Sequence, residues 1–391
     1  MVYDFDTVYE RDSTNSAKWS LRKELGIDDV LPLWIADMDF ACPPEIVKAM
    51  RERVDHPLYG YTTSSSKYYN SLIHWMAKRH DWDGIQREWI CFSPRVVSAF
   101  NFAIQAYSHP GDKVILQPPV YYPMKIAIDN NGRRMVENPL KIINGKYVMD
   151  FEDLEKKIDN RTKMIILCSP HNPVGRVWTH QEIKQLTEIC ERKDIIIVSD
   201  EIHNDLIIGK TKHTCTATIS NDAKQRTVTL VSPSKTFNLA GLANSSVIIP
   251  NKKLRNAYLG ITESNGIHFA NTFGMVSQEA AYTYGEAWLG ELLNYLRENQ
   301  RYLEKFVKTR ISKLIVYPLE GTYLTWVDCS AIGLNDEELK EFMLKKAKLW
   351  FDEGTMFGSG GSMFMRINIA CPRIILQTAL ERLEKAVNEM K

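Results

Sequence analysis

The residues best suited to covalent chemistry lie in the segment S-P-S-K at 232–235. Lys235 follows the apolar run 227–231, which has the composition of a buried strand. Open α/β sheets bind ligands beyond the carboxyl ends of their strands, so we expect the Lys235 amine to face a ligand crevice. An amine in such a place can form a Schiff base with an aldehyde cofactor, and the hydroxyls of Ser232 and Ser234 can bind a phosphate group. A solvated loop lysine is the alternative.

Two further polar side chains follow strand-like runs. Asp200 comes directly after 195–199, and a buried carboxylate there needs a cationic or hydrogen-bonding partner. The protonated ring nitrogen of pyridoxal 5'-phosphate would be such a partner. Asn172 lies in the loop S-P-H-N-P-V-G at 169–175, where prolines and glycine would aim its amide at a fixed point such as the cofactor's phenolic oxygen. We expect the bond between Asn172 and Pro173 to be cis. A helix cap or turn aspartate and an ordinary tight turn are the alternatives.

A helix and an aromatic residue could complete a phosphate and ring site. The stretch 95–107 is typical of a helix, and the free N–H groups at its start, around Val96 and Val97, form a natural phosphate site. Tyr121 follows the strand-like run 114–117 and could stack on a pyridine ring. Core packing is the default for such a tyrosine.

Arg366 lies in a third kind of setting, the strand-like stretch 364–369. Period-two alternation places Arg366 on one face with Phe364 and Asn368. A guanidinium on a strand suits the bidentate binding of an α-carboxylate. A surface salt bridge is the competing explanation for an isolated arginine.

The elements that must position these residues alternate between strand and helix. The capping box T-H-Q-E at 179–182 opens a helix, and buried-strand patterns occur at 114–117, 163–168, 195–199, 227–231 and 246–249. This order implies a mostly parallel sheet covered on both faces. From about Asn271 the chain becomes helical, and strands at 323–328 and 364–369 follow. We therefore predict an α/β fold with a large domain near residues 50–285. A smaller α+β domain would combine 1–49 with 286–391.

Composition excludes several classes of function. The 391 residues carry a net charge of +1 without blocks of like charge, which argues against binding nucleic acid or acidic membranes. No apolar run reaches the roughly 18 residues that span a bilayer, and the first residues lack the apolar core of a signal peptide. Seven cysteines without C-x-x-C pairing fit reduced thiols in the cytoplasm. The absence of H-E-x-x-H leads us to expect no protein-bound metal.

Together these segments resemble the fold-type I pyridoxal-phosphate enzymes of the aminotransferase class I/II superfamily, over nearly the whole chain. The finer motifs D-M-D-F at 37–40 and D-E-I-H at 200–203 resemble one branch, the MalY/PatB-type cystathionine β-lyases. His203 stands where ordinary class I aminotransferases usually have a tyrosine that reaches the cofactor. Ala243 stands where they usually have a phosphate-binding arginine. Both departures favour the lyase branch.

The resemblance implies a role for each candidate residue. It implies that Lys235 is the Schiff-base lysine, which becomes the base for the Cα proton when freed, and that Arg366 holds the substrate carboxylate. It further implies cofactor contacts for the ring partner Asp200, the oxygen ligand Asn172, the stacking Tyr121, the neighbouring His203, the phosphate ligands Ser232, Ser234, Val96 and Val97, and Tyr61. Tyr61 would reach the phosphate from the other subunit of a homodimer.

The activity that the resemblance implies is the β-elimination of a thiol from cystathionine or cysteine-type amino acids, with release of pyruvate and ammonia. Two alternatives stay open. One is an aminotransferase, which shares every step through removal of the Cα proton. The other is a regulatory protein that uses the same fold as a binding surface. A nucleotide-binding protein is disfavoured, because neither G-x-G-x-x-G after an early strand nor a P-loop motif occurs.

Overall fold

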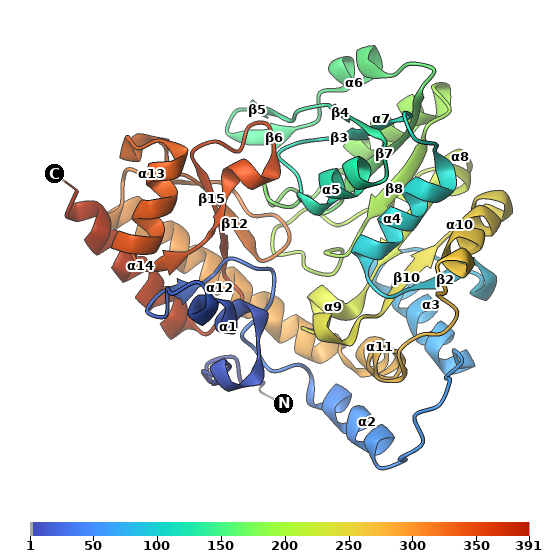
Figure 1. The fold of residues 1–391 in the computed structure, drawn as a ribbon, viewed down its shortest axis with the longest axis horizontal. Coiled ribbons are helices and arrows are strands. Elements are labelled where there is room, and N and C mark those ends of the chain that lie inside the picture. The colour runs from blue at the N-terminus through green and yellow to red at the C-terminus, as the bar shows by residue number, and fades with distance from the viewer. Residues whose placement is uncertain (1–2, 391) are drawn as a thin grey trace.

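The computed structural model describes residues 3–390. Its strands form two main sheets, one of seven strands and one of four, and two short pairs. In Figure 1 the seven-stranded sheet lies in the right-hand part of the molecule and the four-stranded sheet in the left-hand part. Both sheets contribute to the site described below, so their construction decides what the site contains.

The large sheet is mostly parallel, as predicted. Strands β4, β3, β7, β8 and β9 pair in parallel, whereas β10 is antiparallel to both of its neighbours. In spatial order the strands are β2 (Ile90–Ser93), β10 (Ser245–Ile248), β9 (Thr227–Val231), β8 (Ile196–Asp200), β7 (Thr162–Cys168), β3 (Lys113–Leu116) and β4 (Arg134–Glu137).

Alternate residues of the central strands enter two different cores, because successive side chains of a strand point to opposite faces. Ile166 and Val198 belong to the core beneath α4 (Val96–Tyr107), α5 (Pro123–Asn130) and α10 (Lys252–Ser264). Ile165 and Ile197 belong to the core beneath α6 (Phe151–Lys157) and α7 (His180–Arg192). Burial on both faces explains why these strands read as continuous apolar runs.

The start of α7 confirms the predicted capping box. The Thr179 hydroxyl accepts the Glu182 N–H at 3.2 Å, and the Glu182 carboxylate accepts the Thr179 N–H at 2.8 Å. Two N–H groups that the helix leaves unpaired are satisfied in this way.

The small sheet is antiparallel throughout. Its order is β11 (Ile315–Val316), β12 (Leu324–Asp328), β15 (Phe364–Asn368) and β14 (Asp352–Glu353). Helices α12 (Glu286–Arg310) and α14 (Arg373–Asn388) share a core with it. This pattern agrees with the α+β character expected of the C-terminal third.

The N-terminal segment reaches both parts of the molecule. Strand β1 (Leu31–Pro32) pairs in parallel with β13 (Leu349–Trp350), next to α1 (Ala17–Glu24). Helices α2 (Pro44–Val54) and α3 (Ser66–His80) pack instead on α11 (Thr272–Tyr284). Among the helices of residues 3–390, none is long and apolar enough to cross a membrane.

Candidate active site

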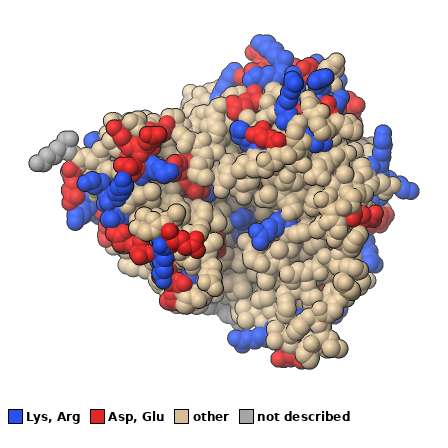
Figure 2. Space-filling view, viewed as in Figure 1, with Lys and Arg blue, Asp and Glu red and all other residues tan. Residues whose placement is uncertain are grey.

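A cavity of about 250 Å³ lies where the carboxyl ends of the central strands meet the small sheet. Every predicted site residue except Tyr61 lines it. Figure 2 shows the surface hollowed between the two parts of the molecule, with Lys or Arg side chains at the edge of the hollow. The position agrees with the rule that open α/β sheets bind ligands beyond the carboxyl ends of their strands.

Lys235 lies on the short helix α9 (Pro233–Thr236), which begins directly after β9. The Ser232 hydroxyl caps α9 by accepting the Ser234 N–H at 3.2 Å. The Lys235 Nζ donates to the Ala36 carbonyl at 2.6 Å. Burial lowers the pKa of Lys235 to about 8, although Asp37 and Asp200 act in the opposite direction. A larger fraction of the amine is therefore in the neutral form, which covalent chemistry requires, than for an ordinary lysine at the same pH.

Asp200 is the last residue of β8 and is buried. Its carboxylate accepts the Ile202 N–H at 3.2 Å, which makes it a turn aspartate as well as a cavity residue. Burial raises the pKa of Asp200 to about 7. A protonated ring nitrogen placed against Asp200 would favour its ionised form and would itself remain protonated.

The loop 169–175 presents Asn172 to the same cavity. The bond between Asn172 and Pro173 is cis, which confirms that prediction. The Asn172 Oδ1 accepts a hydrogen bond from Nη1 of Arg366 at 2.9 Å. The NH₂ group of Asn172 is therefore left to face a ligand oxygen. The loop therefore joins the large sheet to the residue expected to bind the substrate.

Arg366 on β15 is buried, and its partner is the buried Asp352 on β14. The alternative interpretation of Arg366 as part of a surface salt bridge is therefore wrong, because the salt bridge that it forms is buried. Nη2 donates to Asp352 and, at 2.9 Å, to the Trp34 carbonyl. Nε has no partner within residues 3–390. A buried guanidinium with an unused donor at a cavity wall is suited to a carboxylate ligand.

Groups suited to a phosphate also line the cavity. Val96 and Val97 begin α4, where the N–H groups of the first turn have no helical partners. Ser234 lines the same region, and the Ser232 hydroxyl donates to the Asn244 carbonyl at 2.8 Å. The exposed Arg95 adds a positive charge at the rim. These groups are suited to an anion although position 243 is alanine.

Two ring side chains complete the wall. Burial raises the pKa of Tyr121, so its hydroxyl stays protonated. Burial, reinforced by Lys235 and Arg366, lowers the pKa of His203 well below its usual value, so the imidazole is neutral. The Nδ1 atom of His203 has no partner within the described residues. It is free to bond a ligand.

Among the cavity-lining residues that sequence reasoning missed are Trp34, Tyr122 and Asp352. Asp352 lies on a strand of two residues, too short for any periodic pattern, and its register opposite Arg366 follows only from the sheet. Trp34 stacks on Trp350 with ring centroids 4.7 Å apart, a contact between distant segments. The motif L-W-I-A-D-M-D-F was the available signal for Trp34.

Tyr61 lies outside the cavity. Its side chain is 89% exposed, and its ring lies 4.9 Å from that of Phe269. Within one chain, this predicted contact with the cofactor is not made. A role from a neighbouring subunit stays a prediction.

Among the described residues, one group of potential metal ligands lies next to Asp200 but does not line the cavity. Glu201, His213 and Cys215 have ligand atoms within 4.8 Å of one another. The Glu201 carboxylate accepts hydrogen bonds from Ser199, from the Thr216 N–H and from His213. Burial raises the pKa of the Cys215 thiol well above its usual value. The group is explained as a hydrogen-bonded network with a protonated thiol.

Comparison with known proteins identifies the family. The model of the family "Aminotransferase class I and II" matches residues 28–383, and the chain belongs to this family. It is 43% identical to cystathionine beta-lyase PatB of Bacillus subtilis over 98% of this chain and all of PatB. The fold-type I assignment and the likeness to the MalY/PatB branch are thereby confirmed.

Two solved structures are similar over nearly the full length. A PLP-bound putative aminotransferase from Clostridium difficile is 42% identical with a TM-score of 0.97, covering 99% of this chain and 100% of that one. Cystalysin from Treponema denticola is 38% identical with a TM-score of 0.97, covering 100% of both chains. Both contain pyridoxal 5'-phosphate.

The residues of the cavity fit that group. Its donor set comprises an amine of lowered pKa, a buried carboxylate and an anion site at a helix start. Among residues 3–390, the buried Nε of Arg366 and Nδ1 of His203 have no hydrogen-bond partner. A bound ligand with an aldehyde, a ring nitrogen and a phosphate would use the amine, the carboxylate and the helix start, and would leave Arg366 for the carboxylate of a substrate.

The buried carboxylate of Asp200 leads to a prediction about stability. Its folded pKa of about 7 exceeds the usual 3.8, so between these values the folded state holds a proton that the unfolded chain has lost. Stability of the cofactor-free protein therefore falls as the pH rises through this window and then levels off. We expect Asp200→Asn to be more stable than wild type at pH 8 by a few kcal/mol, and the difference to shrink toward pH 5.

Urea denaturation midpoints of the cofactor-free proteins at pH 5, 6, 7 and 8 measure this difference. The exposed Asp194 supplies the control, since Asp194→Asn should change stability little at any of these pH values. A destabilised Asp200→Asn at pH 8, or a difference independent of pH, would contradict the assignment.

Proposed function

We propose that this protein is a pyridoxal 5'-phosphate-dependent carbon–sulfur β-lyase, which acts on cystathionine or cysteine-type amino acids. The observation that carries the proposal is the convergence of Lys235, Asp200 and Arg366 on one cavity. The likeness to cystathionine beta-lyase PatB over both full lengths supports the lyase rather than the transaminase reaction. The absence of the aminotransferase-type arginine and tyrosine at Ala243 and His203 supports the same choice.

The side chains divide the work of β-elimination between them. When bound, pyridoxal 5'-phosphate supplies an aldehyde that links to amines and a ring that takes up the electron pair of the broken Cα–H bond. Arg366 binds the substrate carboxylate and so fixes the orientation of Cα. Lys235, with a pKa lowered to about 8, can take the Cα proton near neutral pH. Asp200 holds a proton at the ring nitrogen.

The products follow from the bond that breaks next. The Cβ–S bond breaks with its electron pair on sulfur, and the thiol departs. Hydrolysis of the remaining fragment gives pyruvate and ammonia, so no keto-acid acceptor is consumed. Trp34 and Tyr122, which line the cavity, supply an apolar wall for a sulfur-bearing side chain.

The lyase reaction predicts pyruvate from cystathionine or an S-alkyl cysteine without any keto acid. We expect Lys235→Ala to abolish this turnover, because the base for the Cα proton is lost. Lys253→Ala, which removes an exposed lysine on α10, should retain it. A coupled assay for pyruvate measures the rate. Amino-group transfer that depends on an added keto acid, without acceptor-free pyruvate, would instead identify an aminotransferase.

We further propose that the enzyme is a homodimer with Tyr61 of each subunit reaching the other subunit's site. Support comes from large apolar side chains exposed around the loop that follows α2, namely Leu58, Tyr59, Tyr61 and Phe269. Exposed apolar patches of this kind are typical of subunit interfaces.

Mixed dimers test the shared site. When Tyr61→Ala and Lys235→Ala subunits are mixed and allowed to exchange, each heterodimer gains one site with both residues intact. We expect pyruvate formation to exceed that of either variant alone. Mixtures that stay at the sum of the two parents, although heterodimers form, would exclude the role of Tyr61 across the interface.

The proposal includes two further assignments, the bounds of the two domains and the location in the cell. Residues 50–285 would form the large cofactor-binding domain, and 1–49 with 286–391 the small one, which is supported by the confinement of the two main sheets to 90–248 and 315–368. A cytoplasmic location is supported by seven cysteines that are all free thiols.

A further inference from the structure

A short backbone segment of the N-terminal region lies directly against the Lys235 amine. Its central residue is Ala36, whose carbonyl accepts Lys235 Nζ at 2.6 Å and the Tyr323 hydroxyl at 3.2 Å. The carboxylate of the next residue, Asp37, is the strongest charge that favours the ammonium form of Lys235. The position of this segment therefore affects where the free amine lies and how readily it binds a proton.

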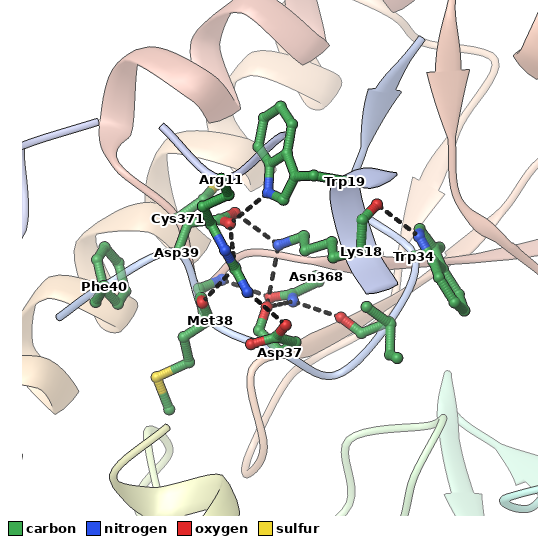
Figure 3. A network of polar contacts seen from close by, with 12 residues as sticks. Arg11, Lys18, Trp19, Trp34, Asp37, Met38, Asp39, Phe40, Asn368 and Cys371 are labelled. Atoms are coloured by element: carbon green, nitrogen blue, oxygen red, sulfur yellow. Dashed lines mark hydrogen bonds and ion pairs between the residues drawn. The ribbon is translucent and has the colours of Figure 1, made fainter. Parts of the chain in front are cut away.

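Asn368 fixes this segment from the small sheet. Its Nδ2 donates to the carbonyls of Ile35 and Asp37, both at 2.8 Å, and so brackets Ala36 (Figure 3). Its Oδ1 accepts the Ala370 N–H at 2.8 Å, which fixes the orientation of the amide. Asn368 is fully buried, so its donors have no water to compete for them.

Two other side chains hold the same segment, and a third holds the residues that follow it. The fully buried Lys18 donates to the Asp37 carbonyl at 3.0 Å and pairs with Asp39 at 2.6 Å. Arg11 binds the carboxylates of Asp37 and Asp39, both at 2.8 Å (Figure 3). Asn238, three residues after Lys235, donates to the carbonyls of Met38 and Phe40.

We propose that Asn368 is a positioning residue for Lys235, which acts by fixing the backbone of residues 35–37 so that the Ala36 carbonyl and the Asp37 carboxylate face the amine. The proposal deepens the lyase function and rests on Lys235 as its base. Asn368 follows Arg366 by two residues on the same face of β15. One strand thus fixes the position of the substrate carboxylate through Arg366. Through Asn368 and the 35–37 backbone, it also fixes the position of the lysine amine.

This arrangement matters because proton removal tolerates little displacement of the base. The groups that face Lys235 are few: Asp37 and Asp200 favour its charged form, Arg366 and Arg95 oppose it, and His203 and Tyr323 are neutral. Without the bracket, Arg11 and Lys18 still hold Asp37, but the backbone at Ala36 loses its fixed position and the Ala36 acceptor withdraws from the amine. That loss acts against the ammonium form.

Asn368→Ala tests the proposal without changing any charge. In the cofactor-free protein, trace acetylation of Lys235 followed by peptide mass spectrometry gives the pH midpoint of the amine, since only the neutral form reacts. We expect the midpoint to fall by about half a unit or more, which corresponds to about threefold higher reactivity below the midpoint. In the holoenzyme, kcat should fall while KM changes little, because Arg366 is untouched.

Asn299→Ala is the matched control. Asn299 is also fully buried, and its Nδ2 donates to the carbonyls of Ile369 and Cys371, both at 2.9 Å, away from residues 35–37. It should lose stability as Asn368→Ala does, without a shift in the Lys235 midpoint. An unshifted midpoint in Asn368→Ala, or an equal shift in Asn299→Ala, would overturn the proposal.

A second variant tests the same point if Asn368→Ala does not fold. Asn368→Ser fills more of the space but is too short to bracket both carbonyls, and the same downward shift is expected. Acetylation uses no cofactor or substrate, so its result stands apart from the lyase assay. If the wild-type protein forms no pyruvate without a keto-acid acceptor, the proposed function is wrong. The shift of the Lys235 midpoint can still be interpreted in that case.

Discussion

The structure depends on one constraint: an amine and a carboxylate must both be kept out of bulk water in a single cavity. Burial moves the pKa of Lys235 down to about 8 and that of Asp200 up to about 7. Each shift costs folding free energy in the cofactor-free protein, because each disfavours the charged form that water would stabilise. A ligand that bonds both groups recovers part of that free energy on binding. The cavity therefore lowers the stability of the cofactor-free protein and is suited to a ligand with complementary groups.

The parallel sheet explains how the large domain meets this constraint. Adjacent strands β8 and β9 end at the same edge, which brings Asp200 and the start of α9 together although they are far apart in the chain. The small sheet adds Arg366, and the buried Asp352 compensates its charge. Removing either partner would leave an unpaired buried charge, so the pair keeps both side chains in place at this wall of the cavity.

The sequence predicted those features that local patterns determine. Apolar runs located the central strands, the capping box located α7, and alternation placed Arg366 and Asn368 on one face. It did not predict Asp352, whose two-residue strand has no periodicity, or the Ala36 carbonyl, since a backbone acceptor leaves no trace in residue type. Tyr61 was singled out only by family likeness, and its exposure in one chain shows that residue patterns within a chain do not define a contact between chains.

The central claim is that the Lys235 amine carries pyridoxal 5'-phosphate. Reduction of the purified holoprotein with borohydride, followed by peptide mapping, tests it most directly. The account predicts one stable pyridoxyl label, located on Lys235, and loss of the visible absorption of the cofactor. A protein that stays colourless after saturation with the cofactor, or a label that maps to another lysine, would contradict it.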